Sequence, residues 1–236
     1  MKFAVCSLAI GDEYKKTMRL CTESQEAHVK KHGYTRITDE SVYDSSRAHA
    51  WSKIRLLQKY LENYDYLVWM DADVLIMNQD RKIEEFIQLL PEDKFLLIGK
   101  DFNNLNSGVT VWRNCPLAHE FLEDVWNKTE YLNHEWWEQA AIIDLYGSPK
   151  YKSGFEVIPR KYVSIMNAFD FRVDPKVHWR PGDFCIHFAG IHHRESLLQL
   201  QDMYTRFAST DPVGTLRIEN YINERNEIMR LKTENA

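Results

Sequence analysis

The sequence has no apolar run long enough to cross a membrane and no strongly basic segment. A transmembrane helix needs about 18 or more consecutive apolar residues, and every apolar run among these 236 residues is shorter. Lys and Arg number 30 against 35 Asp and Glu, a formal net charge of −5, whereas nucleic-acid-binding domains cluster basic residues on one face. We therefore predict no transmembrane segment and no nucleic-acid partner.

Cysteine is scarce, and none of the four cysteines belongs to a C-x-x-C pair. Cys6 and Cys185 lie in apolar runs, which predicts buried thiols in a reducing compartment rather than disulfides. Disulfides are also unnecessary for a chain of this length, because it can bury a substantial core. The sequence lacks linkers rich in Pro, Gly or Ser, internal repeats and low-complexity tracts. One compact domain is the simplest interpretation.

Apolar runs alternate with helical spacings along the first 110 residues. The runs at 3–10 and 66–70 are typical of strands buried on both faces, whereas the spacing of Ile54, Leu57 and Leu61 is that of a helix. This alternation predicts an α/β fold with a mainly parallel sheet flanked by helices. We expect further strands at 95–98, 109–112, 155–158 and 184–188, and helices up to about residue 32 and at 83–90, 116–127, 135–146 and beyond 195.

The predicted strand at 66–70 ends in two aspartates, Asp71 and Asp73. Residues i and i+2 of an extended chain point the same way, so both carboxylates would converge at the end of the sheet where α/β proteins bind ligands. Adjacent buried carboxylates repel, and a hard divalent cation relieves the repulsion while binding phosphate oxygens. The alternative is a polar turn that caps the next helix. The apolar strand before the pair favours the metal site.

A histidine stands in the late apolar run at 184–188. A neutral His187 imidazole there is a candidate ligand for Mn²⁺, and the alternative is a core histidine bonded to a backbone carbonyl. Gly190 would let the backbone approach a phosphate closely. His192 and Arg194 follow at once, either to neutralise phosphate charge or to form a solvated turn.

Five other residues are candidates for donor contacts. Asn106, Ser107 and Gly108 precede a predicted strand, where they suit recognition of sugar hydroxyls or an ordinary turn. Lys53 borders the apolar stripe of its helix and either reaches a pyrophosphate or extends to solvent. Ser7, in the first apolar run, is also assigned to the donor.

Two adjacent tryptophans, Trp136 and Trp137, lie near the start of a predicted helix. Neighbours on a helix cannot both face one core, so at least one should lie near the surface or a pocket, where aromatic faces pack on sugar rings. Glu138 and Gln139 follow and are candidates for contacts with a donor sugar. Simple packing is the alternative for all four.

The order of these motifs resembles that of glycosyltransferase family 34, which holds fungal α-galactosyltransferases, α-1,6-mannosyltransferases and plant xyloglucan α-xylosyltransferases. The resemblance runs from residue 3 to about residue 194. No single motif is decisive, but five in the right order are specific. The motifs are Trp51-Ser52-Lys53, Trp69-Met70-Asp71-Ala72-Asp73, Asn106-Ser107-Gly108-Val109, Glu138-Gln139-Ala140 and His187-Phe188-Ala189-Gly190.

This resemblance implies the GT-A fold, a Rossmann-like nucleotide-binding sheet merged with an acceptor-binding part. It implies Mn²⁺, with Mg²⁺ as an alternative, and retention of anomeric configuration. Asp71, Asp73 and His187 become the metal ligands, and Glu138 and Gln139 the catalytic pair. With the residues argued above, the predicted donor-binding set is Ser7, Lys53, Asp71, Asn106, Ser107, Gly108, Gly190, His192 and Arg194, and the predicted acceptor-binding set is Trp136 and Trp137.

The predicted GT-A domain spans 1–236. Residues up to about 110 form its nucleotide-sugar-binding part, 111–194 its acceptor and metal part, and 195–236 a helical tail. Two features depart from the family. Members usually carry an N-terminal Golgi anchor, whereas this sequence has no apolar run long enough to be one. We therefore expect a soluble or cytoplasmic enzyme, or a Golgi-lumen one if an anchor has been removed. Plant members also have Cys-Lys where this sequence has Ile191-His192, so that lysine's phosphate contact is missing here, and we expect His192 or Arg194 to substitute for it.

The predicted reaction moves a sugar from a nucleotide-sugar, with a UDP-sugar favoured, to a glycan hydroxyl. Galactose is the first choice of sugar, followed by xylose and mannose. Attack on the same face, with the leaving phosphate as base, is favoured over a covalent intermediate on Glu138. The alternatives are a metal-dependent hydrolase of nucleotide-sugars or phosphate esters, and a carbohydrate-binding module with an inactive site.

Overall fold

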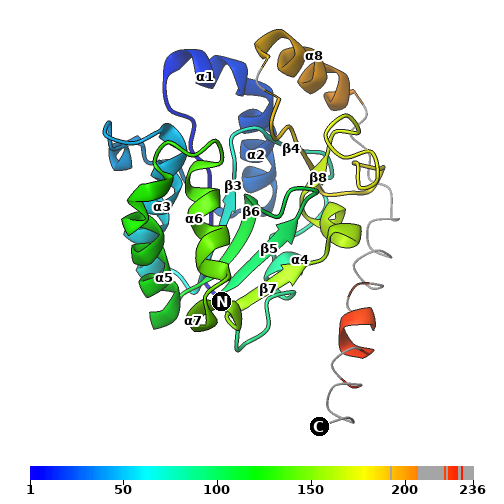
Figure 1. Ribbon diagram of the computed structural model, residues 1–236. Coiled ribbons are helices and arrows are strands. Elements are labelled where there is room, and N and C mark those ends of the chain that lie inside the picture. Colours follow the sequence, from blue (N-terminus) through cyan, green and yellow to red (C-terminus); the bar gives the residue numbers. More distant parts are fainter. Residues whose placement is uncertain (192, 207–220, 222, 228–229, 231–236) are drawn as a thin grey trace.

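A six-stranded sheet with the order β2-β1-β3-β6-β5-β7 forms the centre of the computed structural model (Figure 1). The structure describes residues 1–191, 193–206, 221, 223–227 and 230. Within this sheet β6 alone runs antiparallel to its neighbours, so the prediction of a mainly parallel sheet is confirmed. The strands are β1 (Phe3–Cys6), β2 (Thr35–Ile37), β3 (Tyr66–Met70), β5 (Leu96–Lys100), β6 (Leu105–Arg113) and β7 (Phe155–Ile158).

Helices cover both faces of this sheet because its central strands are apolar on both sides. In β3, Leu67 and Trp69 pack into one core cluster, whereas Val68 and Met70 pack into the other, as the two-residue period of a strand requires. The first cluster lies under α3 (Ser52–Tyr60), α5 (Pro116–Asn127) and α6 (Trp137–Tyr146), with the short α7 (Pro149–Lys152) nearby. The second lies under α2 (Arg19–His32) and α4 (Ile83–Ile87).

A second, three-stranded sheet positions the residues of the candidate site. Its order is β4-β9-β8, from β4 (Val74–Ile76), β9 (Cys185–His187) and β8 (Ala168–Phe169). β4 pairs antiparallel with β9, and the register places Val74 opposite His187. This pairing brings residue 187 beside the segment that follows β3. Helix α8 (Arg194–Thr205) and the start of α2 pack on this sheet, and α1 (Asp12–Thr17) lies near α8 (Figure 1).

Several elements differ from the sequence-based expectations. The apolar run 3–10 is a strand only to Cys6, since the chain then leaves the sheet, and Leu8 and Ile10 line a cleft. The helix expected up to residue 32 is two helices, α1 and α2. The strands β2, β4 and β8 are only two or three residues long, too short to leave a periodic signal. Asn106–Gly108 lie inside β6 rather than in a turn before it.

The expected tail from residue 195 is helical in α8, and residues 221, 223–227 and 230 are helical too. The remainder of the predicted tail lies outside the described residues, as does His192.

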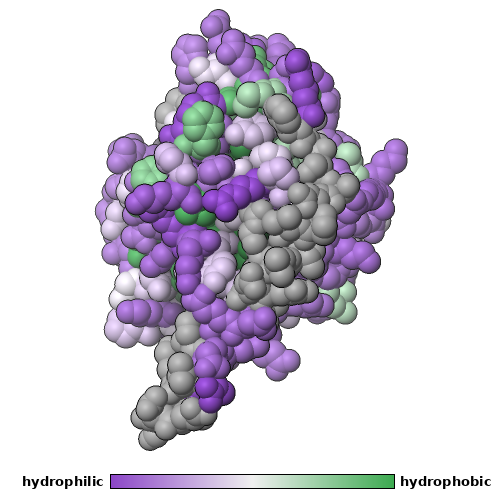
Figure 2. Space-filling view, turned by 90° about the vertical axis from the view of Figure 1, so that its right-hand side faces the viewer, coloured by the Kyte–Doolittle hydropathy of each residue, from purple (hydrophilic) through white to green (hydrophobic). Residues whose placement is uncertain are grey.

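Among the described residues, no helix has the length and apolar character needed to span a membrane. The four cysteines are free, and three of them are buried. The face shown in Figure 2 is mainly hydrophilic, with scattered apolar side chains.

A buried glutamine fastens the segment between β3 and β4 to α2. The Gln25 side chain is fully buried, and its Nε2 donates to the carbonyl oxygens of Asp71 at 2.9 Å and Val74 at 2.8 Å. The Val74 N–H also donates to the Asp71 carbonyl at 3.1 Å and closes a turn. Gln25 therefore holds both ends of the turn that carries the two aspartates.

We expect Gln25→Leu to lower the free energy of unfolding by about 1–2 kcal/mol, because buried carbonyl groups lose a donor. Urea unfolding followed by circular dichroism measures the change. The matched control is Gln58→Leu, where a half-buried amide bonds to the Leu122 carbonyl and to Glu123. Water replaces those bonds, so the control should change stability by about 0.5 kcal/mol or less. Equal losses in the two variants would contradict the fastening role.

Candidate active site

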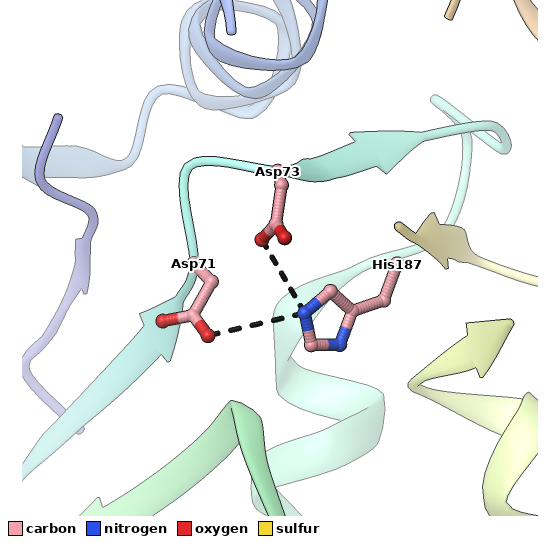
Figure 3. Close-up of side chains that lie close together, drawn as sticks. All are labelled: Asp71, Asp73 and His187. Atoms are coloured by element: carbon pink, nitrogen blue, oxygen red, sulfur yellow. Dashed lines mark ion pairs between the residues drawn. The ribbon is translucent and has the colours of Figure 1, made fainter. Parts of the chain in front are cut away.

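Two carboxylates and an imidazole meet at the end of β3. Asp71 follows β3, Asp73 lies in the turn before β4, and His187 ends β9 (Figure 3). The Nε2 atom of His187 lies 3.3 Å from Asp73 Oδ1 and 3.9 Å from Asp71 Oδ2. One potential ligand atom from each residue lies within 4.8 Å of the other two. The aspartates converge through a turn rather than by strand alternation, which corrects the expected geometry.

This donor set fits a divalent cation. Carboxylate oxygens suit hard cations, and an added imidazole nitrogen suits Mn²⁺ among the divalent metals. Burial lowers the pKa of His187, but the charges of Asp73 and Asp71 and the hydrogen bond to Asp73 together raise it more, so the net shift is upward. Burial raises the pKa of Asp73, yet the His187 charge and hydrogen bond leave it below its ordinary value. The carboxylates of Asp71 and Asp73 thus favour positive charge at the point where a cation would be held.

A buried lysine holds the other oxygen of Asp71. Asp71 Oδ1 accepts from Trp69 Nε1 at 2.6 Å and lies 3.0 Å from Lys53 Nζ. Both donors are on this oxygen, so Oδ2 is the one that faces His187 (Figure 3). Neither Trp69 nor Lys53 is itself a candidate metal ligand. The side chains around Asp71 therefore fix which carboxylate oxygen is presented to a cation.

Lys53 lies at the centre of a buried charge cluster. Only 4% of its side chain is exposed, and Nζ lies 2.8 Å from Glu138 Oε1, 3.0 Å from Ser107 Oγ and 3.1 Å from the Ser107 carbonyl oxygen. Burial lowers the pKa of Lys53, but the carboxylates of Asp71 and Glu138 raise it more, and the net shift is upward. Of the two alternatives for Lys53, extension to solvent is wrong. Its ammonium group is directed to protein oxygens.

The predicted catalytic pair is held against β6. Ser107 Oγ donates to Glu138 Oε1 at 3.1 Å, and the Ser107 backbone N–H donates to Gln139 Oε1 at 2.9 Å. Burial raises the pKa of Glu138, and the Lys53 charge opposes that shift without cancelling it. Because Gln139 Oε1 is engaged by the backbone, its amide nitrogen is the group that Gln139 offers to a ligand.

A cleft of about 810 Å³ opens above these groups. Its walls come from α1, the start of α3, the loop after β5, the start of α6 and the chain after β9. The predicted site residues that line it are Lys53, Asp71, Asp73, Asn106, Ser107, Trp136, Trp137, Glu138, Gln139, His187, Gly190 and Arg194. Arg194 pairs with Glu13 at 2.9 Å. Ser7 is buried and does not line the cleft, so a direct donor contact by Ser7 has no structural support.

The chain resembles known glycosyltransferases both in sequence and in fold. The model of a family described as galactosyl transferase GMA12/MNN10 matches residues 86–197. A second family model, for a protein of unknown function, DUF273, matches residues 25–139. The chain is 26% identical to an alpha-1,2-galactosyltransferase of Schizosaccharomyces pombe, over 72% of this chain and 55% of the relative. The resemblance to glycosyltransferase family 34 is confirmed.

A second family relative is a probable alpha-1,6-mannosyltransferase MNN10 of Saccharomyces cerevisiae, 23% identical over 71% of this chain and 54% of the relative. The chain thus spans a little over half the length of these relatives. A crystal structure of a glycosyltransferase involved in the glycosylation of the major capsid of PBCV-1 aligns with a TM-score of 0.69 and 20% identity, covering 86% of this chain and 100% of the other. That likeness concerns the fold alone, and it confirms the predicted GT-A fold.

Gly108 makes room for the His187 ring. A Cβ atom on Gly108 would lie 2.0 Å from His187 Cε1 and 2.5 Å from Nδ1, closer than non-bonded atoms approach. The structure therefore gives Gly108 a packing reason to be glycine. Asn106 also has its amide engaged within the protein, since Nδ2 donates to Asp101 Oδ2 and Oδ1 accepts from the Gly108 N–H.

Four functional candidates were missed from the sequence. Gln25 and Asn167 are buried polar side chains that reach the cluster of Asp71, Asp73 and His187 through one hydrogen bond. Asp101 bonds to Asn106, and Tyr14 lines the cleft. The only signal for Asn167 was a lone polar residue in an apolar stretch. Tyr14 and Asp101 gave none.

With Mn²⁺ as the probe cation, we expect Gly108→Ala to bind it about tenfold or more weakly than wild type, because the new methyl group displaces the His187 ring. Titration of the variant with Mn²⁺, followed by electron paramagnetic resonance of the free ion, measures this. Gly154→Ala is the control, since its Cβ would meet the Phe95 ring at 2.3 Å, away from the metal cluster. The control should lose stability but keep its affinity for Mn²⁺. Equal affinity in Gly108→Ala and wild type would refute the packing role.

Lys53→Met should lower the free energy of unfolding by about 3 kcal/mol or more, because it leaves buried carboxylates without their counter-ion. Urea unfolding tests this. The double variant Lys53→Met/Glu138→Gln should recover part of the loss, since it removes one uncompensated charge. Lys59→Met removes a surface lysine that pairs with Asp39 and should cost less than about 1 kcal/mol. A Lys53 variant as stable as the Lys59 variant would show that the buried cluster is unimportant for folding.

Proposed function

We propose that this protein is a metal-dependent glycosyltransferase that moves a sugar from a nucleoside-diphosphate sugar to a hydroxyl group of a glycan acceptor. The observation that carries the proposal is the meeting of Asp71, Asp73 and His187 within 4.8 Å beside a large cleft. Two segments more than a hundred residues apart in sequence carry these side chains, and the pairing of β4 with β9 brings them together. The naming of the relatives as galactosyl- and mannosyltransferases supports the same activity.

The metal ligands we propose are Asp71 Oδ2, Asp73 Oδ1 and His187 Nε2, and the cation we favour is Mn²⁺. A divalent cation held there would bind the diphosphate of the donor and offset the charge that grows on it as the sugar leaves. The chain adds two groups that line the cleft. Gly190 has a φ of 73°, and a Cβ there would meet open space, so its backbone is accessible to a phosphate. The Arg194 guanidinium pairs with Glu13 at 2.9 Å and would also face the diphosphate.

The donor sugar we favour is galactose, followed by xylose and mannose, and the nucleotide is UDP. Galactose comes first because of the galactosyltransferase relative. We place the nucleotide mainly on residues 1–110 and the acceptor on 111–194. Trp136 and Trp137 line the cleft and would present aromatic faces to acceptor sugar rings. Trp137 has a φ of 43°, an uncommon conformation for a bulky residue that is typically retained at functional sites.

Retention of configuration through same-face attack fits the environment of Glu138 better than a covalent intermediate. Glu138 Oε1 is bonded to Lys53 and Ser107, and these contacts stabilise the carboxylate charge and reduce its tendency to attack carbon. In our proposal Glu138 and Gln139 instead border the donor sugar. The carboxylate favours the positive charge of an oxocarbenium-like sugar, and the Gln139 amide binds its hydroxyl groups. The leaving phosphate accepts the acceptor proton.

The test is transfer by wild type and by Asp73→Ala with UDP-galactose, UDP-xylose or GDP-mannose, an oligosaccharide acceptor and Mn²⁺. We expect wild type to form the extended glycan, to lose activity in EDTA and to regain it with Mn²⁺. Asp73→Ala should fall to background, because the cation loses a ligand. Asp93→Ala, an exposed aspartate whose recorded ion pair is with Lys94 at 3.9 Å, should match wild type.

Two outcomes would overturn the proposal. Full activity of Asp73→Ala without added metal would rule out the metal-dependent mechanism. Release of free sugar at the same rate with and without acceptor would identify a hydrolase instead. Mass spectrometry of the products separates the extended glycan from free sugar.

A further inference from the structure

A line of buried hydrogen bonds runs from His187 to the loop after β5. His187 Nδ1 lies 3.2 Å from Asn167 Oδ1, Asn167 Nδ2 donates to Asn106 Oδ1 at 2.9 Å, and Asn106 Nδ2 donates to Asp101 Oδ2 at 3.0 Å. Asn167 is fully buried and the other three are at most 9% exposed. Because these groups are shielded from water, each amide must meet its hydrogen-bonding partner within the protein.

The direction of this line is fixed at its far end. The carboxylate of Asp101 only accepts when ionised, and its other oxygen accepts from the backbone N–H groups of Asn103 and Asn104 at 2.7 and 3.0 Å. Asn106 must therefore turn its amino group toward Asp101. Its Oδ1 then faces the Gly108 N–H at 3.0 Å and the amino group of Asn167.

The same argument continues to the imidazole. Because Asn167 gives its amino group to Asn106, its Oδ1 is the atom that faces His187 Nδ1. An oxygen there requires a proton on Nδ1. In a neutral imidazole the other nitrogen, Nε2, is then unprotonated, and Nε2 is the atom that points to Asp71 and Asp73 (Figure 3).

We propose that Asn167, Asn106 and Asp101 form a positioning relay that keeps the proton of His187 on Nδ1 and presents Nε2 as a ready ligand for a divalent cation. This inference rests on the metal site of the proposed function. The three residues touch neither the cation nor the donor in this role. They set the tautomer and the ring orientation of a ligand, a kind of support whose loss costs about 10- to 100-fold in metal affinity.

The first experiment compares Mn²⁺ affinity, without any donor, in wild type and Asn167→Leu. Leucine is close to asparagine in size but accepts no hydrogen bond. We expect the affinity to fall about tenfold or more. Asn78→Leu is the matched control, because Asn78 is also buried and bonds to the Gly182 carbonyl and the Asp80 N–H away from the cluster. It should keep wild-type affinity even if its thermal stability falls equally.

A second variant separates hydrogen bonding from packing. Asp101→Ala leaves Asn167 and the His187 ring in place but removes the acceptor that sets the direction of the relay. We expect the Mn²⁺ affinity of Asp101→Ala to fall as well, but by less than that of Asn167→Leu. Affinities equal to wild type in both Asn167→Leu and Asp101→Ala would overturn the relay, and so would an equal fall in Asn78→Leu.

A direct measurement on wild type keeps the inference testable if Asn167→Leu does not fold. Nuclear magnetic resonance of protein labelled with ¹⁵N-histidine and loaded with Zn²⁺, a diamagnetic probe, reports the protonated ring nitrogen. The His187 signal is assigned by its loss in His187→Ala. We expect a proton on Nδ1, and a proton on Nε2 would refute the relay.

These outcomes distinguish the relay from the proposed function. If wild type binds Mn²⁺ and transfers sugar while Asn167→Leu retains full affinity, only the relay fails. If wild type binds Mn²⁺ with the expected tautomer but transfers no sugar, the proposed function fails and the relay stands. If wild type binds no Mn²⁺, both fail.

Discussion

The structure depends on the balance of charge beneath its cleft. Asp71, Asp73 and Glu138 place three carboxyl groups in one partly buried region, and carboxylates that share a site repel one another unless positive charge lies between them. Lys53 lies 3.0 Å from Asp71 and 2.8 Å from Glu138, and His187 lies beside Asp73. Lys53 supplies that positive charge for Asp71 and Glu138, and its ammonium group is committed to protein oxygens. Beside Asp73 the site offers the His187 imidazole, whose Nε2 would join the carboxylates in holding a divalent cation.

Strand pairing makes this balance possible. β3 ends at Met70 in the large sheet, and β4 begins at Val74 in the small one, so the two aspartates occupy the crossing between sheets. The small sheet then returns His187 to the same point from more than a hundred residues away. Backbone hydrogen bonds fix strand register, and register fixes which side chain faces which. Gly108 completes the arrangement, because any side chain there would occupy the space of the ring.

A second layer of polar groups surrounds the charged one. Gln25 holds the turn that carries the aspartates, Ser107 holds the residues at the start of α6, and Asn167 holds the imidazole. Each makes its contacts inside the protein, where unpaired polar atoms are costly. These polar groups hold the side chains of the site in place before a cation or substrate binds. A preorganised site loses less free energy to ordering on binding.

The sequence by itself determined the fold class and the identities of the three clustered side chains. Apolar runs buried on both faces report strands, and the Asp-x-Asp and His187 motifs fall at strand ends, so both features are local and readable from order alone. The tertiary structure decided what depends on contacts between distant residues. It turned Lys53 inward because two carboxylates compensate its buried charge. It placed Asn167, a lone polar residue in an apolar stretch, against a ring 20 positions away, since only folding determines which buried amide meets which partner.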